Sequence, residues 1–455
     1  MQASNPLNEL CRFLSRASLE RLPSATVKQA RRVLIDTAGV MVAGAAQAEV
    51  GACAEKLSRG VHEGGTVICP GRTEAFAPLD AALVGGMAGS SLEYEEGNAR
   101  AMGHPAVQMV PALLAEAQEL DATGERLLLA LIAGYETASR VSRASTMRKG
   151  LHPTGTWGVV GCAVGVGLLH ERSSSDLEAL AHLSASYAFS PYVKNSFAGW
   201  NAASTFAALT NHLGILSNVF LDAGLRADPG AFEMTFSRLL SEGFEPETLS
   251  RGPGDPFAIE ENYFKPYPTC RFTHPALEAL KAALGGETVT PGEVERITVH
   301  SFGAAVHSGG RPPANAEALR FSVPYLLAVL MHRGGVGLDV LDDDLIREES
   351  VRELAARVDL VLSDDYEAMR PERSPARVTL SLRDGRELTG EVLDCLGDPP
   401  NPMADGELRR KFLFLTENTL SGRQARSFLD GLEVLHEVPS VRSWIRMLKP
   451  EEAAA

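Results

Sequence analysis

The chain has 455 residues, of which 58 are Asp or Glu and 43 are Lys or Arg, so its formal net charge is −15. This acidity argues against binding to nucleic acid or to an anionic membrane, because both partners require a basic surface. The six cysteines include no CxxC pair, which argues against a zinc or iron–sulfur site and is typical of reduced thiols. The N-terminus lacks the apolar segment of a signal peptide, and the longest uncharged apolar run, near residues 157–169, is Gly-rich and shorter than the ~20 residues of a membrane span. We therefore expect a soluble cytoplasmic protein.

Helical patterns fill roughly the first 260 residues. Residues 26–46 carry apolar side chains at a helical period, and residues 79–92 are rich in Gly, Ala and Ser, which allow helices to approach closely. Further helices are predicted at residues 105–120, 125–145, 156–169, 175–190 and 201–216. We expect these segments to form a tightly packed helical core without a sheet.

The pattern changes after Pro268, where strands appear. Residues 293–302 alternate as a strand, and residues 377–393 form two β-rich runs around Asp384-Gly385, a pair that suits a hairpin turn. A short strand is predicted at residues 360–362, and helices at residues 275–284, 322–333, 343–357, 407–416 and 422–435.

These patterns predict a mainly α protein with an α+β part. Residues 1–268, completed by residues 400–455, form a large all-helical domain, and residues 269–399 form a smaller inserted α+β lid domain. The cleft between two such domains is the expected ligand site.

Common cofactor and hydrolase motifs are absent from the sequence. It contains neither GxGxxG after a strand nor GxxxxGK[ST], so neither type of nucleotide site is supported. It also lacks HExxH, an EF-hand loop and the GxSxG of many hydrolases.

Two histidines precede predicted helices. Carboxylates of residues 93–96 come before His104-Pro105, and the segment GLHPTGTWGVVG repeats the arrangement with His152-Pro153. Because helix N-termini attract anions, each histidine is a candidate to meet a substrate carboxylate or to move a proton. Thr154 or Thr156 is the expected N-cap of the second helix. The alternative for both histidines is a structural place in an ordinary loop.

Three further segments offer polar groups. Lys194 follows an apolar helix and is either a partly buried cation or a lysine that reaches solvent. The segment KPYPTCRFTH, at the domain boundary, offers Lys265, Cys270, Arg271 as a carboxylate clamp, and His274 as an acid or base, or is only a hinge. Tyr325, in RFSVPY, is either a hydrogen-bond donor or a core residue.

These segments, in this order, resemble the MmgE/PrpD family, which includes 2-methylcitrate dehydratase, cis-aconitate decarboxylase and iminodisuccinate epimerase. The resemblance spans nearly the whole chain. The matching segments are GMAGSSLEYEEGN, GHPAVQMVPALLA, GYETASR, GLHPTGTWGVVG, KNSFAGWNAA, KPYPTCRFTH, RFSVPY and NPMADGELRRKF. It implies a helical domain with a smaller α+β lid, a homodimer, and a reaction that needs no metal or organic cofactor.

The resemblance also implies functional residues. The catalytic set is His104, His152, Lys194, His274 and Tyr325, and the substrate-binding set is Glu93, Cys270 and Arg271. One loop departs from the family. Dehydratase and decarboxylase members typically read DFDDT or DFNDT there, whereas residues 93–97 read EYEEG, so Asp has become the longer Glu and a Thr hydroxyl is lost.

The implied chemistry is proton abstraction next to a carboxylate of a small di- or tricarboxylic acid, with cations stabilising the enediolate-like charge. We expect a lyase of the dehydratase type. The alternatives are an epimerase or racemase, a decarboxylase of a cis-aconitate-like acid, a carboxylate-binding protein without turnover, and a metal-dependent hydrolase. A small anionic substrate then requires a positively charged pocket within an acidic surface.

Overall fold

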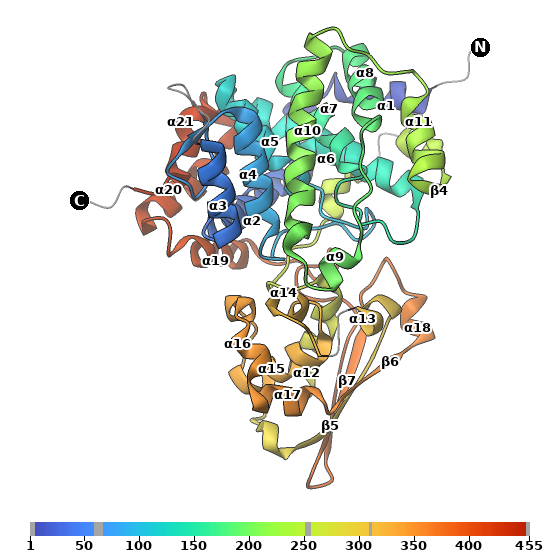
Figure 1. Cartoon of the computed structure of the whole chain (residues 1–455), viewed down its shortest axis with the longest axis vertical. Coiled ribbons are helices and arrows are strands. Elements are labelled where there is room, and N and C mark those ends of the chain that lie inside the picture. Colours follow the sequence, from blue (N-terminus) through green and yellow to red (C-terminus); the bar gives the residue numbers. More distant parts are fainter. Residues whose placement is uncertain (1–4, 59–66, 251–255, 309–311, 452–455) are drawn as a thin grey trace.

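The computed structural model describes residues 5–58, 67–250, 256–308 and 312–451 and shows two bodies, one above the other (Figure 1). The upper body is helical and contains elements from both ends of the chain, whereas the lower body contains the elements from α12 to β8 and the largest sheet. This arrangement confirms the predicted fold class, which is mainly α with an α+β part.

The helical body is built around α7 (Gly158–Leu169), which is apolar on all sides and buried except at Leu168. Helices pack against it because an element without a polar face must be covered on every side. The surrounding long helices are α2 (Ser24–Gly44), α4 (Pro78–Ser90), α5 (Val110–Glu119), α6 (Gly124–Ala144), α8 (Ser174–Ala185) and α10 (Ser204–Asp222).

Small residues bring these helices into close contact, as expected. A Cβ atom added to Gly86 of α4 would lie 2.6 Å from the Cα atom of Ala208 in α10. One added to Gly161 of α7 would lie 2.5 Å from the carbonyl oxygen of Gly134 in α6. Backbone therefore packs on backbone at both crossings.

Several short elements of this body escaped the sequence patterns. They are α1 (Pro6–Leu14), α3 (Ala48–Ser58), α9 (Lys194–Phe197), α11 (Ala231–Met234), the β1–β2 pair (Val67–Ile68 and Ala75–Phe76) and the β3–β4 pair (Ser145–Met147 and Ser241–Phe244). The expectation of a helical domain free of strands is therefore wrong in detail. The β3–β4 pair brings residues 145–147 beside residues 241–244, at one edge of the cavity described below.

The lower body is a four-stranded sheet of order β6-β5-β7-β8, comprising β5 (Val294–Ser301), β6 (Val358–Leu362), β7 (Ala376–Leu382) and β8 (Glu387–Val392). Strand β6 is parallel to β5, and the other pairs are antiparallel. The β7–β8 hairpin turns at Asp384-Gly385 as predicted, with a φ of 89° at Gly385 that favours glycine.

The helices of this body lie around a second apolar core, which includes residues from all of them except the two short helices after β5 and β6. The helices are α12 (His274–Leu284), α13 (Gly303–His307), α14 (Ala316–Leu319), α15 (Val323–Arg333), α16 (Asp344–Arg347), α17 (Glu349–Ala355) and α18 (Asp364–Glu367). The single helix predicted at residues 343–357 is wrong, because the backbone becomes extended at Glu348 and separates α16 from α17.

The chain returns to the helical body with α19 (Asp405–Thr416), α20 (Gly422–Glu433) and α21 (Val441–Ile445). Phe412, Phe428 and Trp444 stack in one column, with ring centroids 5.3 and 4.6 Å apart, and belong to the helical core. We keep the domain boundaries near residues 268 and 400 as a proposal.

All six cysteines are free. Within the described ranges, no single helix is long and apolar enough to cross a membrane, and the one helix pair that reaches the length, α2 with α3, is bent by 86°.

We predict that Gly86→Ala destabilises the protein, because the new Cβ atom must push the backbone of α10 away. The expected loss is about 1–3 kcal/mol in the free energy of unfolding, measured by urea denaturation. Gly335→Ala is the matched control, since its added Cβ atom meets nothing within 4 Å. Equal stability of the two variants would contradict the close packing of α4 on α10.

Candidate active site

A large cavity opens between the two bodies. The helical body contributes the loops around His104 and His152, and the α+β body contributes Arg271, Phe272 and the segment at residues 370–374. Its charged lining consists of Glu93, Arg148, Lys149, Arg271 and Arg370. The lining therefore contains more cations than carboxylates, although Arg148 and Lys149 are exposed and Arg271 is the only one of the expected cations among them. Residues 342–344 lie exposed on the outer surface.

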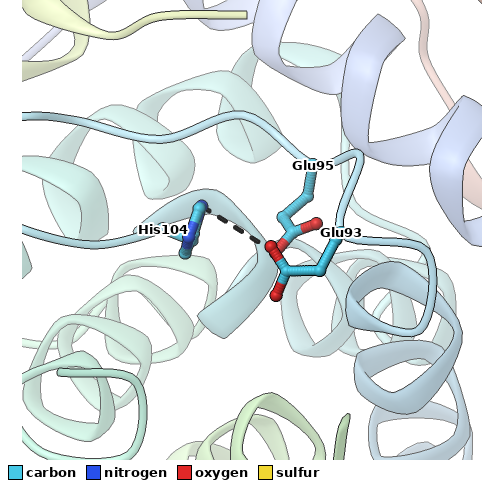
Figure 2. Close-up of side chains that lie close together, drawn as sticks. All are labelled: Glu93, Glu95 and His104. Carbon is cyan, nitrogen blue, oxygen red and sulfur yellow. Dashed lines mark ion pairs between the residues drawn. The ribbon is translucent and has the colours of Figure 1, made fainter. Parts of the chain in front are cut away.

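Glu93, Glu95 and His104 point toward one another at this cavity (Figure 2). Both carboxylates come from the loop after α4, in which Glu93 has a φ of 52°. A left-handed conformation is uncommon for a residue other than glycine and costs of order 1 kcal/mol. In this loop, the left-handed conformation directs the carboxylates of Glu93 and Glu95 toward the imidazole of His104.

The cation that holds this loop is Lys265, whose side chain is completely buried. Its Nζ atom donates to the carbonyl oxygen of Glu93 at 2.8 Å and to Oε2 of Glu93 at 3.0 Å, and it lies 3.8 Å from Oε2 of Glu95. Burial raises the pKa of Glu93, but the ammonium of Lys265, together with His104 and Arg320, outweighs it and holds the pKa below its ordinary value. Burial raises the pKa of Glu95 despite the same ammonium.

The three side chains in Figure 2 also have the composition of a metal site, with ligand atoms within 4.8 Å of one another. Lys265, however, already supplies a positive charge to both carboxylates. The cluster therefore contains its own counter-ion, and its donor set does not require a metal.

The backbone fixes the tautomer of His104. Its Nδ1 atom lies 2.8 Å from the carbonyl oxygen of Glu96, which can only accept, so Nδ1 carries the proton. Burial and the ammonium of Lys265 lower the pKa of His104 to about 4, so the ring is neutral near pH 7. Its Nε2 atom is consequently an unprotonated base, and it forms no hydrogen bond to the described residues.

His152 has the opposite tautomer. The backbone N–H of Thr154 donates to its Nδ1 atom at 3.1 Å, so in the neutral ring the proton is on Nε2. Burial and the neighbouring imidazole of His104 lower the pKa of His152 to about 4. One cavity therefore presents an imidazole acceptor and an imidazole donor.

The predicted helix N-termini are wrong at both histidines. A 3₁₀ turn (Ala106–Gln108) separates His104 from α5, and the N–H of Ala106 is already bonded to Oε1 of Glu96 at 2.7 Å. Thr156 donates to the carbonyl oxygen of Pro153 at 2.6 Å instead of capping α7. Glu96, with a pKa raised to about 8 by burial, thus uses the N–H that we expected to bind substrate.

Five of the eight predicted site residues line this cavity, namely Glu93, His104, His152, Cys270 and Arg271. The other three lie elsewhere. Lys194 begins α9 with an exposed side chain. His274 is buried beside the ring of Tyr267 and has its Nε2 atom 3.2 Å from the carbonyl oxygen of Thr269. Tyr325 belongs to the core of the α+β body.

Three important residues were not in the predicted set, namely Lys265, Tyr263 and Arg370. Lys265 begins the segment KPYPTCRFTH, and its position between aromatic and proline residues was the available signal of burial. Tyr263 lies two positions earlier and lines the cavity, so it occupies the place that we expected for Tyr325.

The departure from the family loop at Gly97 has a steric cause. A Cβ atom at this position would lie 2.3 Å from the hydroxyl oxygen of Tyr263. The two residues also exchange backbone hydrogen bonds, at 3.1 and 2.7 Å. The phenol of Tyr263 therefore fills the space in which a threonine side chain would stand, and it supplies a hydroxyl there.

Two family descriptions match this chain. The MmgE/PrpD N-terminal domain matches residues 8–248, and the MmgE/PrpD C-terminal domain matches residues 267–437. Cis-aconitate decarboxylase of Aspergillus terreus is 24% identical over 484 residues, which covers 96% of this chain and 94% of the relative. Cis-aconitate decarboxylase of Mus musculus is 24% identical over 467 residues, which covers 95% of this chain and 91% of the relative.

We predict that Lys265→Met is strongly destabilising at pH 8, by about 3–5 kcal/mol in the free energy of unfolding, because it leaves buried carboxylates without a cation. Without the cation, the pKa of both carboxyl groups in the folded state rises above the unfolded value. Such groups bind protons more readily when folded, so the variant recovers stability as the pH falls toward 5.

The matched control is Lys28→Met, which removes an exposed ion pair with Asp405. Urea denaturation at pH 8 and pH 5.5 should show little effect of this control at either pH. A Lys265→Met loss that does not depend on pH would contradict the proposed electrostatic role.

Proposed function

Because the chain belongs to the MmgE/PrpD family, we propose that it is a cofactor-independent lyase that removes a proton next to a carboxylate of a small di- or tricarboxylic acid. The observation that carries this proposal is the pair of opposite tautomers at His104 and His152. Breaking a C–H bond and expelling a neighbouring group needs one base and one acid at the same substrate.

In this proposal Nε2 of His104 removes the proton. Burial and the ammonium of Lys265 keep His104 neutral, and the same ammonium stabilises negative charge that develops on the substrate. Nε2–H of His152 or the hydroxyl of Tyr263 gives a proton to the leaving group. Arg271 has a buried Nη1 atom without a partner among the described residues and is placed to bind a substrate carboxylate.

The reaction type depends on which group leaves. Loss of a β-hydroxyl group gives dehydration, which we propose as the activity. Loss of CO₂ leaves its bonding electron pair on carbon, so decarboxylation replaces proton removal, and an acid of the site must then give a proton to that carbon. The names of both relatives favour this reaction as the second candidate.

Return of the proton to the opposite face gives epimerisation. The thiol of Cys270 supports this alternative, because it lines the cavity and its pKa is raised by burial to about 12, so that it is a neutral donor. The homodimer implied by the family and the cytoplasmic location expected from the sequence also stay predictions.

The deciding experiment incubates the protein in D₂O with hydroxylated, amino-substituted and unsaturated di- and tricarboxylic acids, followed by proton NMR. New alkene signals from a hydroxy acid support dehydration, and release of CO₂ from an unsaturated tricarboxylate supports decarboxylation. Deuterium at a stereocentre with a new diastereomer supports epimerisation. Binding without exchange or turnover would favour the non-catalytic alternative.

We predict that His104→Gln and His152→Gln each lower kcat by about 10²–10⁴-fold, the usual contribution of a general base or acid. His332→Gln, on α15 away from the cavity, is the control and should keep full activity. Circular dichroism would verify the fold, and near-normal turnover of His104→Gln would remove this residue from the mechanism.

We also predict that both cavity histidines react with diethyl pyrocarbonate at acidic pH, because only neutral imidazole is the nucleophile. A pKa of about 4 leaves both rings neutral from pH 7.5 to 5.5. An ordinary histidine would lose about tenfold in rate over this range. The measurement is the rate of inactivation that a bound dicarboxylate prevents, and a tenfold fall would contradict the lowered pKa values.

A further inference from the structure

Two arginines of the α+β body, Arg271 and Arg370, line one end of the cavity. Arg271 is 7% exposed, and its Nη2 atom donates to Oδ1 of Asp398. Its Nη1 atom is buried and has no hydrogen-bond partner among the described residues. A buried, unpartnered guanidinium nitrogen is costly, and because Arg271 lines the cavity, an anion bound there would offset the charge of this side chain.

The second arginine is held in a fixed orientation. Nη1 of Arg370 donates to the hydroxyl of Ser374 at 2.6 Å and to the carbonyl oxygen of Arg373 at 3.3 Å. Its guanidinium carbon lies 4.5 Å from the centre of the Phe302 ring, and this stacking fixes the plane of the guanidinium group. Nε and Nη2 of Arg370 form no hydrogen bonds to the described residues, so donors remain for a ligand.

At this end of the cavity, the positive charges of Arg271 and Arg370 are only partly compensated by nearby carboxylates. Burial and the nearby guanidinium of Arg271 lower the pKa of Arg370, while the carboxylates of Asp398 and Glu367 act in the opposite direction. Asp398 is bonded to Arg271 and to the N–H of Cys395, and Glu367 accepts from the N–H of Gly303 at the exposed edge. An additional anion between the two arginines would relieve their repulsion.

The two ends of the cavity are linked by one aromatic ring. The guanidinium carbon of Arg271 lies 5.1 Å from the ring centre of Tyr263, and the imidazole of His104 lies 6.4 Å from the same centre. The guanidinium carbon of Arg271 therefore lies no more than about 11.5 Å (5.1 + 6.4) from the imidazole centre of the proposed base.

We propose that Arg271 and Arg370 form a subsite for a second substrate carboxylate, the one remote from the carbon that loses its proton. This inference rests on the lyase activity proposed above and assigns to the two arginines the second carboxylate of that di- or tricarboxylic acid, so that the substrate spans Tyr263. The α+β body then selects the substrate, whereas the helical body performs the proton transfer.

The test uses unreactive probes, so that it does not depend on turnover. Isothermal titration calorimetry compares succinate and glutarate, each with its monoamide, on the wild-type protein and on Arg370→Gln, Arg370→Lys and Arg373→Gln. Each monoamide keeps the size of its parent acid but has one charge fewer. Arg373 is the control, because its partly exposed side chain pairs with Asp394 and does not line the cavity.

Wild type and Arg373→Gln should bind at least one diacid tenfold or more tightly than its monoamide. Arg370→Gln should lose most of this preference. Arg370→Lys should keep part of it, because lysine keeps the positive charge but lacks the paired N–H donors of the guanidinium group. Thermal midpoints show whether each variant is folded, and Arg370→Lys serves as the test if Arg370→Gln is not. An unchanged preference in a folded Arg370 variant, or no preference in wild type, overturns the subsite.

Failure of the lyase proposal gives a different result. Protein that prefers the diacids through Arg370, yet exchanges no proton in D₂O, would have the subsite without the proposed reaction. Protein that turns over a hydroxy acid but shows no effect of Arg370 on the preference would be a lyase with another binding mode.

Discussion

The buried ion pair between Lys265 and the carboxylates of Glu93 and Glu95 is the interaction on which the rest of the site depends. An ammonium group without solvent contact is stable only when hydrogen bonds and opposite charges replace its water. Lys265 finds them in one carbonyl oxygen and two carboxylates of a single loop. The left-handed conformation of Glu93 persists because this cation holds the loop in place.

The same loop determines the state of the base. The carbonyl oxygen of Glu96 fixes the proton of His104 on Nδ1, and the side chain of Glu96 is itself held by Ala106 and by the hydroxyl of Tyr135 at 3.0 Å. The tautomer is therefore set by backbone position and not by a second titrating side chain. Because the Tyr263–Gly97 bridge joins this loop to the segment that carries Lys265, the base and its electrostatic support form one unit.

More of the fold than of the candidate site could be predicted from the sequence. Periodicity identified α2, α4, α6, α7 and the β7–β8 hairpin, because a buried helical face or an alternating strand leaves a pattern in neighbouring residues. It missed α1 and α3 at the edge of the helical body, and it joined α16 and α17 into one helix across the extended backbone at Glu348. His104-Pro105 has the composition of a helix start, but the bond from Ala106 to Glu96 depends on packing that the sequence does not state.

The errors within the site have one physical reason. A lysine in apolar surroundings is compatible with either Lys194 or Lys265, and what separates them is a counter-charge 172 positions away in the sequence. Tyr325 and Tyr263 differ in the same manner, since only the fold shows which phenol meets Gly97. The resemblance to the family correctly indicated the segments, but a segment of ten residues has side chains on several sides, and only some of them reach the cavity.

The net charge of −15 does not oppose an anionic substrate, because the cavity reverses the sign locally with four lining cations. An acidic exterior even favours selectivity, since it repels polyanions that are too large to enter while a small acid gains from the arginines once inside. The division of labour between the bodies extends this argument. Proton transfer depends on loops of the helical body, whereas recognition of the remote carboxylate depends on arginines of the α+β body. A change of substrate length can then be accommodated by the α+β body without disturbing His104, so related chains can keep one base while they act on different acids.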